Sequence, residues 1–292
     1  MTARLAPLNA QRGFTLVELI MVIILMGVIG GMVAVFMKSP IDAYFDTARR
    51  AGLTDVADTV VRRMGRDIRK ALPNSIRSAG SQCVEFIPTK IGARYRADAG
   101  GGGDVLDFTL AAGDGSFNML GRNADLPTDQ QIVPGDLVAI YNLGMTGADA
   151  YAADNTSAVT SASAEAGSPA ESVIAIAAKK FPLESPNKRF HVIPANEKVV
   201  RYVCVGASGT NAQGHGNGTL YRQVLALPQA ESASCPASVT GAAIMAERVS
   251  SCNFNYSGSD LQRNALISMR LQITDSGETV SLQHEVHVSN AP

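Results

Sequence analysis

The sequence lacks tryptophan and has few aromatic residues, which make up 5% of its 292 positions. Glycine, alanine and serine are plentiful instead. Large enzymes usually line a deep pocket with aromatic and other large apolar side chains. This composition therefore favours a domain of loops and short strands, and we expect no enzyme activity, no cofactor and no resident metal.

A surplus of charge of either sign is also absent. The formal net charge is −1, from 25 Lys and Arg side chains against 26 Asp and Glu side chains. Proteins that bind the phosphate backbone of nucleic acids usually carry a strong positive surplus. The overall balance therefore predicts no nucleic-acid partner and gives no sign of binding to an anionic membrane surface.

One long segment is almost without charge. From Phe14 to Met37 the chain runs for 24 residues with Glu18 as its one charged side chain. A helix rises about 1.5 Å per residue, so this segment reaches roughly 36 Å, which exceeds a bilayer core of about 30 Å. The cationic segment Met1–Gly13 precedes it, whereas a secretory signal has a shorter apolar region with a cleavage site at its far end. The segment predicts a membrane-spanning helix.

Glu18 is the unusual residue of this span. A carboxylate in hydrocarbon costs a few kcal/mol even on lenient insertion scales, so it requires a partner. A cation can neutralise it, and breaking such a buried pair costs about 3–5 kcal/mol. The alternative is an ordinary signal anchor that happens to contain a glutamate.

Four cysteines, Cys83, Cys204, Cys235 and Cys252, all lie beyond the apolar segment. An even number there fits disulfide bonds formed in an oxidising, exported compartment, so we expect the N-terminus inside and the C-terminal part outside. Four cysteines allow three pairings, which stay open here. The pairing that we favour joins Cys204 to Cys235 and Cys83 to Cys252.

The apolar segment is expected to continue as an amphipathic helix. Apolar side chains recur every three or four residues from Leu53 to Leu72, which is the pattern of one helical face. We expect a helix over about Phe14–Leu72, with a bend near Ser39–Pro40 because proline lacks the donor N–H and clashes with the preceding turn. Its second half must bury the apolar face against the chain that follows.

That following chain has the pattern of short strands separated by turn-rich loops. The expected strands are 83–88, 105–110, 137–142, 173–177, 190–193, 199–205, 219–224, 252–256, 266–274 and 279–288. Asp275-Ser276-Gly277 turns the last two strands into the clearest hairpin. Exposed loops are expected at Gly100–Gly103, Gly147–Ser172 and Gly206–Gly218. The fold class is α+β, with a long N-terminal helix packed on an antiparallel β-sheet.

The N-terminal segment resembles a type IV prepilin. The resemblance rests on a short basic leader that ends in Gly13, on Phe14, and on the Thr-Leu-Val-Glu-Leu block that leads into the apolar run. In that family a prepilin peptidase cuts after the glycine and methylates the new N-terminus. The resemblance therefore implies cleavage between Gly13 and Phe14, methylation of Phe14, and pairing of Glu18 with the N-terminal ammonium of a neighbouring subunit during assembly.

This resemblance implies a pilin-like organisation in four segments. Residues 1–13 are the leader peptide, 14–37 the transmembrane and assembly helix, 38–74 the amphipathic second half of the helix, and 75–292 a β-rich globular pilin domain. The implied partners are a prepilin peptidase, other major or minor pilins through the N-terminal helix, and the inner membrane. The protein would cross that membrane once, with a cytoplasmic N-terminus and a periplasmic C-terminal domain, before it reaches the pilus at the cell surface.

Blocks beyond the N-terminus resemble the MshO family of MSHA-type pilus biogenesis proteins, which is related to the J-type minor pseudopilins of type II secretion. These blocks are residues 44–47, 49–51, 62–75, 83–89, 137–144 and 284–288. The resemblance implies a minor pilin that takes part in building or tipping an MSHA-like pilus. Two alternatives stay open, a minor pseudopilin and a tip adhesin that binds through the loops around Gly147–Ser172.

Other patterns have simpler interpretations. His284 and His287 are three residues apart on an expected strand, so they point to opposite faces and make a poor metal pair. Asp98, Asp104 and Asp107 carry oxygen atoms of the kind that Ca²⁺ prefers, but the sequence fixes no loop geometry for them.

Two further segments suggest nucleotide or nucleic-acid binding. The run Gly100–Gly103 lacks the G-x-G-x-x-G order and the flanking strand and helix of a nucleotide loop, so it is interpreted as a linker. A basic cluster at residues 62–70 is interrupted by Asp67, preceded by Asp58, and has no aromatic residue nearby. A solvated helix face is therefore the better interpretation of the cluster.

Overall fold

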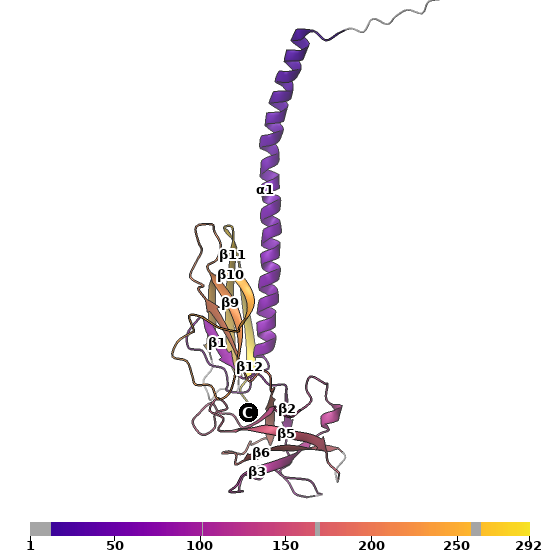
Figure 1. Ribbon diagram of the computed structural model, residues 1–292, viewed down its shortest axis with the longest axis vertical. Coiled ribbons are helices and arrows are strands. Elements are labelled where there is room, and N and C mark those ends of the chain that lie inside the picture. Colours follow the sequence, from indigo (N-terminus) through magenta and orange to yellow (C-terminus); the bar gives the residue numbers. More distant parts are fainter. Residues whose placement is uncertain (1–12, 101, 167–169, 258–263) are drawn as a thin grey trace, which may run out of the picture. The chain divides into compact units, whose positions relative to one another are not determined.

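A computed structural model describes residues 13–100, 102–166, 170–257 and 264–292 (Figure 1). The described residues contain one α-helix, a short 3₁₀ helix η1 (Asn123–Asp125) and twelve β-strands. The chain forms two compact units, Met1–Ala51 and Gly52–Pro292. The long N-terminal helix and the antiparallel sheets confirm the expected α+β class.

Helix α1 (Leu16–Ile68) is the long helix that the apolar run predicts. The helix continues through Pro40, so this proline does not end it. The helix ends four residues before the expected Leu72. There the N–H groups of Lys70 and Ala71 donate to the carbonyls of Asp67 and Ile68, three residues back, at 3.1 and 3.0 Å, so the pattern of bonds four residues back stops. The N–H of Leu72 then donates to the carbonyl of Ile87 at 2.8 Å, which ends the helix by pairing the chain with a later segment.

The first sheet has six strands in the antiparallel order β1-β8-β9-β10-β11-β12. They are β1 (Cys83–Phe86), β8 (Val199–Val205), β9 (Gly218–Leu225), β10 (Ala243–Ser257), β11 (Asn264–Asp275) and β12 (Glu278–Ser289). The predicted hairpin of β11 and β12 is confirmed, and the strands pair from Asn264 with Ser289 to Asp275 with Glu278. Its two turn residues, Ser276 and Gly277, both have positive φ (51° and 85°), as a two-residue hairpin turn requires.

The second sheet has six strands in the antiparallel order β2-β7-β4-β5-β6-β3. They are β2 (Ile91–Arg94), β3 (Asp114–Leu120), β4 (Leu137–Ile140), β5 (Thr156–Ala164), β6 (Glu171–Lys179) and β7 (Arg189–Ile193). The expectation of a single sheet was therefore too simple. Strands β4, β6 and β7 were expected from the sequence, whereas β2, β3 and β5 were not.

Two local predictions were wrong, and each error has a physical cause. The expected loop Gly147–Ser172 contains β5, whose small Ser, Ala and Thr side chains fit between β4 and β6 while Val159 is buried. The expected strand over residues 105–110 is irregular. There the Asp107 carboxylate accepts hydrogen bonds from the N–H and hydroxyl of Thr109, both at 2.7 Å, and such local bonds compete with a sheet ladder.

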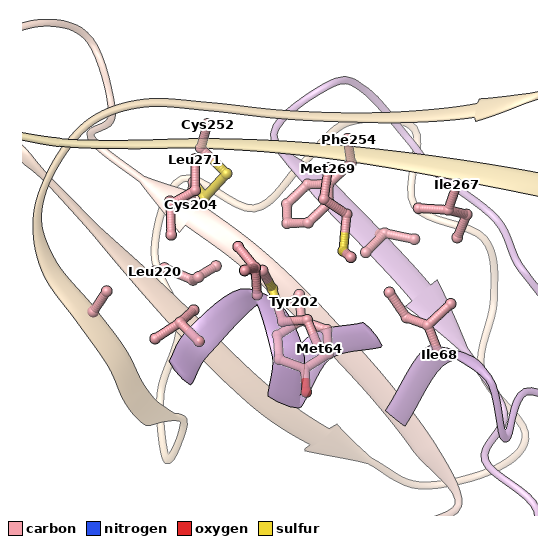
Figure 2. Close-up of a cluster of buried hydrophobic side chains, with 14 of the residues drawn as sticks. Met64, Ile68, Tyr202, Cys204, Leu220, Cys252, Phe254, Ile267, Met269 and Leu271 are labelled. Carbon is pink, nitrogen blue, oxygen red and sulfur yellow. A yellow bond between two sulfur atoms is a disulfide. The ribbon is translucent and has the colours of Figure 1, made fainter. Parts of the chain in front are cut away.

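The main core lies between the second half of α1 and the first sheet, where the helical stripe was expected to bury itself. Figure 2 shows Met64 and Ile68 of α1 against inward-facing side chains of the sheet, among them Tyr202, Phe254 and Met269. All five side chains are at least 95% buried. Complete burial of a large apolar side chain contributes about 1.5–3 kcal/mol, so this face fixes the helix on the sheet.

Two further clusters complete the second unit. One consists largely of buried side chains from the second sheet and is rich in aromatic contacts. In it the rings of Phe117 and Phe190 pack edge to face, with 5.2 Å between their centroids. The other brings Leu72 and Ile87 together with Tyr151, Ile193 and other buried side chains of the 139–199 region. Because this last cluster draws on residues next to both sheets, it joins them into one folded unit.

The disulfide pairing differs from the one that we favoured. Cys83 is bonded to Cys235, and Cys204 to Cys252. The segment between β9 and β10 folds back over β1, where Arg77 Nη2 donates to the carbonyl of Gln229 at 2.9 Å. That return brings Cys235 to Cys83, and it leaves Cys204 of β8 to pair with Cys252 of β10, whose Cα atom is 6.3 Å away.

Gly65 is a point of close approach between α1 and β12, and a substitution there tests the packing. A Cβ atom at Gly65 would lie 2.6 Å from His284 Nε2 and 3.4 Å from Val286 Cγ2, whereas nothing lies within 4 Å of a Cβ at Gly52. We expect Gly65→Leu to lower the free energy of unfolding by about 1–3 kcal/mol through overpacking. Gly52→Leu, the matched control, should raise it by about 0.5–1 kcal/mol through helix propensity. Thermal unfolding in detergent measures both, and a stabilising Gly65→Leu would contradict this packing.

His191 predicts a dependence of stability on pH. Burial on β7 and, second, the charge of Arg189 lower the pKa of His191 from its usual 6.5 to about 4. The unfolded chain therefore binds the proton more readily, and stability that is complete above pH 6.5 is lost as the pH falls toward 4. We expect the native protein to lose about 2–3 kcal/mol more between pH 7 and pH 4 than His191→Gln does. The exposed His287→Gln is the control, and it should behave like the native protein in urea unfolding at each pH.

Candidate functional site

The candidate site is the start of α1, where Thr15 acts as the N-terminal cap. Gly13, Phe14 and Thr15 precede the helix and are exposed. The hydroxyl of Thr15 accepts a hydrogen bond from the N–H of Glu18 at 3.3 Å, and its carbonyl accepts one from Leu19 at 3.1 Å. Such a cap contributes about 1 kcal/mol to a helix. Our sequence reasoning missed this role, although Thr-x-x-Glu before an apolar run is the signature of a capping box.

Glu18 lies in the first turn of α1 with its carboxylate free. The side chain is exposed, and within residues 13–292, apart from the short undescribed segments, no hydrogen bond or ion pair engages the carboxylate. The positive end of the helix dipole favours an acid at this position by about 0.3–1 kcal/mol. That is less than the few kcal/mol that a carboxylate costs inside a membrane, so Glu18 still requires a cation from elsewhere.

The apolar segment that follows is exposed around its whole circumference. Phe14 is 81% exposed, and every large apolar side chain from Leu16 to Met37 is at least 46% exposed. A helix that is apolar on all sides is stable when lipid or other helices surround it, not water. Among the described residues α1 is the one helix long and apolar enough to cross a membrane.

The residues of the expected processing site lie just before the helix. Gly13 and Phe14 are exposed and not helical, so the peptide bond between them lies in an accessible part of the described chain. The rest of the expected leader, residues 1–12, lies outside the described residues. The four cysteines belong to the second unit, and all of them are in disulfide bonds.

The other patterns do not form a site. His284 shares the face of the buried Val286 and approaches Gly65, whereas His287 is on the opposite, exposed face of β12. The carboxylate of Asp104 accepts from Ser116, and that of Asp98 from the N–H of Gly100. Within the described parts of the chain, no three His, Cys, Asp or Glu side chains are grouped to hold a metal ion.

Comparison with known proteins adds one finding at the start of the chain. The prokaryotic N-terminal methylation motif matches residues 8–34, which include Gly13, Phe14, Thr15 and Glu18. The N-terminal segment of the chain is type IV prepilin-like. A prepilin-like N-terminus implies processing by a prepilin peptidase and assembly with pilins, and α1 fits a single-pass membrane anchor for such a protein. The motif does not extend to residues 35–292, and no curated protein and no solved structure matches the chain.

Proposed function

We propose that this prepilin-like protein is a minor pilin that takes part in the biogenesis of an MSHA-like type IV pilus. The observation that carries the proposal is the combination, at the start of α1, of the methylation motif with a free carboxylate and an exposed apolar surface. No part of it requires a substrate or a cofactor. The role is structural assembly.

Processing creates the partner of Glu18. Cleavage between Gly13 and Phe14 releases a new N-terminus at Phe14, whose ammonium group is the nearest chemically suitable cation that a neighbouring subunit can offer. The pair is buried among apolar helices, so a lone Glu18 or a lone ammonium is costly, and the loss of one partner costs about 3–5 kcal/mol. The pair therefore favours subunits that are docked in the correct register.

The apolar surface provides little of this selectivity. On leaving the bilayer for the filament, α1 exchanges one apolar environment for another, so the hydrophobic term nearly cancels. Close helix packing has to come from small residues instead. Gly27, Gly30 and Gly31 have no neighbouring atom within 4 Å of a Cβ position in the single chain, so this part of the helix is open to a second helix.

The finer assignment, to a minor pilin of the MSHA type, rests on the sequence blocks. In the structure these blocks coincide with parts of the second half of α1 and with β1, β4 and β12. Two disulfides in the second unit support export of that unit to the periplasm. The tip-adhesin alternative rested on the length of the expected loop Gly147–Ser172, and β5 (Thr156–Ala164) of the second sheet shortens that loop. A minor pseudopilin shares the same N-terminus, and a deletion strain distinguishes it by loss of secretion in place of loss of surface pili.

Glu18→Ala tests the proposal. The variant should insert into the membrane as the native protein does, because removal of a charge does not weaken an apolar span. Its amount in sheared pilus fractions should fall at least about tenfold, since the neighbouring ammonium is left unpaired. Asp55→Ala, which removes an exposed acid of the second unit, is the control. Equal incorporation of Glu18→Ala and the native chain would contradict the proposal.

A further inference from the structure

One segment of the second unit lies on the first sheet without burying any residue of its own. Residues 229–242, which we call the strap, follow β9, lead into β10 and contain no helix or strand. Every residue of the strap is exposed or half-buried. Because apolar burial is the main force that fixes a segment in a fold, the strap has to be held in another way.

The strap covers the face of the first sheet that is opposite to the main core. Phe86 of β1 and Tyr202 of β8 belong to that core. Their neighbours Glu85 and Arg201 point to the other face, because side chains alternate along a strand. There Arg201 Nη2 donates to Ser232 Oγ of the strap at 3.2 Å.

Few bonds attach the strap to this face. Arg77 Nη2 donates to the carbonyls of Gln229 and Ala230 at 2.9 and 3.1 Å, and the N–H of Gln229 donates to the carbonyl of Tyr151 at 3.0 Å. Each such bond replaces a bond to water, so its net contribution is small. The disulfide formed by Cys235 is therefore the main attachment of the strap.

A polar cluster with a surplus positive charge lies under the strap. Arg77 Nε and Arg201 Nε donate to the two carboxylate oxygens of Glu85 at 2.8 and 2.6 Å. The three side chains are at most 17% exposed, so two cations share one anion there. Charged side chains of this kind usually face solvent. We call these three residues the arginine patch, and it has the composition of an exposed surface that the strap covers.

The strap closes the arginine patch. The cavity that the patch lines together with Cys83 and Ser232 has a volume of about 10 Å³, which is room for about one water molecule. Glu231 of the strap is exposed at this cavity, and no ion pair joins it to either arginine in the described parts of the chain. The arginines can therefore become accessible only if the strap moves.

The two disulfides differ in their access to solvent. Cys204 and Cys252 lie inside the main core, where they are 2% and 6% exposed (Figure 2). Cys235 is half-buried on the strap, directly after the exposed residues 233 and 234. Thiol–disulfide exchange requires that a thiolate reach one of the two sulfur atoms. A reductant therefore reaches the bond between Cys83 and Cys235 first.

We propose that the Cys83–Cys235 disulfide is a redox-sensitive latch, which a dithiol opens to release the strap from the arginine patch while both sheets stay folded. One thiolate of the dithiol attacks Sγ of Cys235, the S–S bond breaks, and Cys83 leaves as a thiolate. The second thiolate of the dithiol then breaks the mixed disulfide and releases Cys235. The dithiol becomes a disulfide, and its two protons pass to the two cysteines.

The surroundings of Cys83 favour this exchange. Cys83 lines the same cavity as the two arginines of the patch, and a nearby positive charge stabilises the thiolate that leaves. The core and the Cys204–Cys252 disulfide do not depend on the strap, so the opening is local. The inference does not rest on the proposed function, because it uses residues of the second unit alone.

The test uses the full chain in phosphatidylcholine nanodiscs, titrated with dithiothreitol as the dithiol. Free thiols are trapped with N-ethylmaleimide and located by peptide mass spectrometry. Cys83 and Cys235 should be labelled at least about tenfold faster than Cys204 and Cys252. Phenylglyoxal, which modifies accessible arginines, should then react with the arginine patch at least about tenfold faster than in the oxidised protein.

Matched variants separate the latch from a general loss of structure. Cys83→Ala combined with Cys235→Ala should make the arginine patch reactive without a reductant, whereas Cys204→Ala combined with Cys252→Ala should leave it protected. The exposed Arg94 should react at the same rate in every sample. Hydrogen exchange of β11 and β12 should not change when the latch opens.

Three results would overturn the proposal. They are equal rates of reduction of the two disulfides, an arginine patch that stays unreactive after Cys83 and Cys235 are reduced, and loss of the protection of β11 and β12 together with release of the strap. If the variant without Cys204 and Cys252 does not fold, the titration of the native protein still decides, because it requires no variant.

Discussion

The central constraint on this protein is a carboxylate in an apolar helix that its own chain does not neutralise. Glu18 is the one charge in a segment whose surface is apolar on every side, and no described residue pairs with it. A span of this kind is stable in a bilayer or among other helices, and in either place the acid requires a cation. The methylation motif matches the residues around Gly13 and Phe14, and in the proposed function the cation is the amine that cleavage between these two residues would create at this end of the helix.

The second half of the same helix obeys the opposite constraint. Its apolar side chains occupy a single stripe, and the first sheet covers that stripe with a core that includes Met64, Ile68 and Tyr202 (Figure 2). Gly65 permits the close approach of β12, and two disulfides secure the strands and the long connection before β10. The one helix thus has a half that depends on partners outside the chain and a half that is part of a folded domain.

The parts of the fold that depend on local patterns could be predicted from the sequence. The apolar run and the helical stripe predicted α1, and the turn at Ser276 and Gly277 predicted the hairpin of β11 and β12. The strands β3 and β5 could not be found in this way. β5 consists mostly of small Ala, Ser and Thr residues, which show no apolar alternation. β3 contains the fully buried Asn118, whose side-chain N–H donates to the carboxylate of Glu171, 53 residues away, at 2.8 Å. Long-range contacts also decided the disulfide pairing. In the candidate site, Phe14 and Glu18 were predictable from their motif, whereas the free carboxylate of Glu18 required the structure.

The most direct test of the account is the mass of the mature N-terminal peptide. The protein should be isolated from the membranes of cells that make a prepilin peptidase, digested, and analysed by tandem mass spectrometry. The account predicts a chain that begins with N-methylated Phe14, so that the amine which pairs with Glu18 exists. A chain that still begins at Met1, or one that is cut after the apolar segment, would contradict it, because Glu18 would then have no such partner.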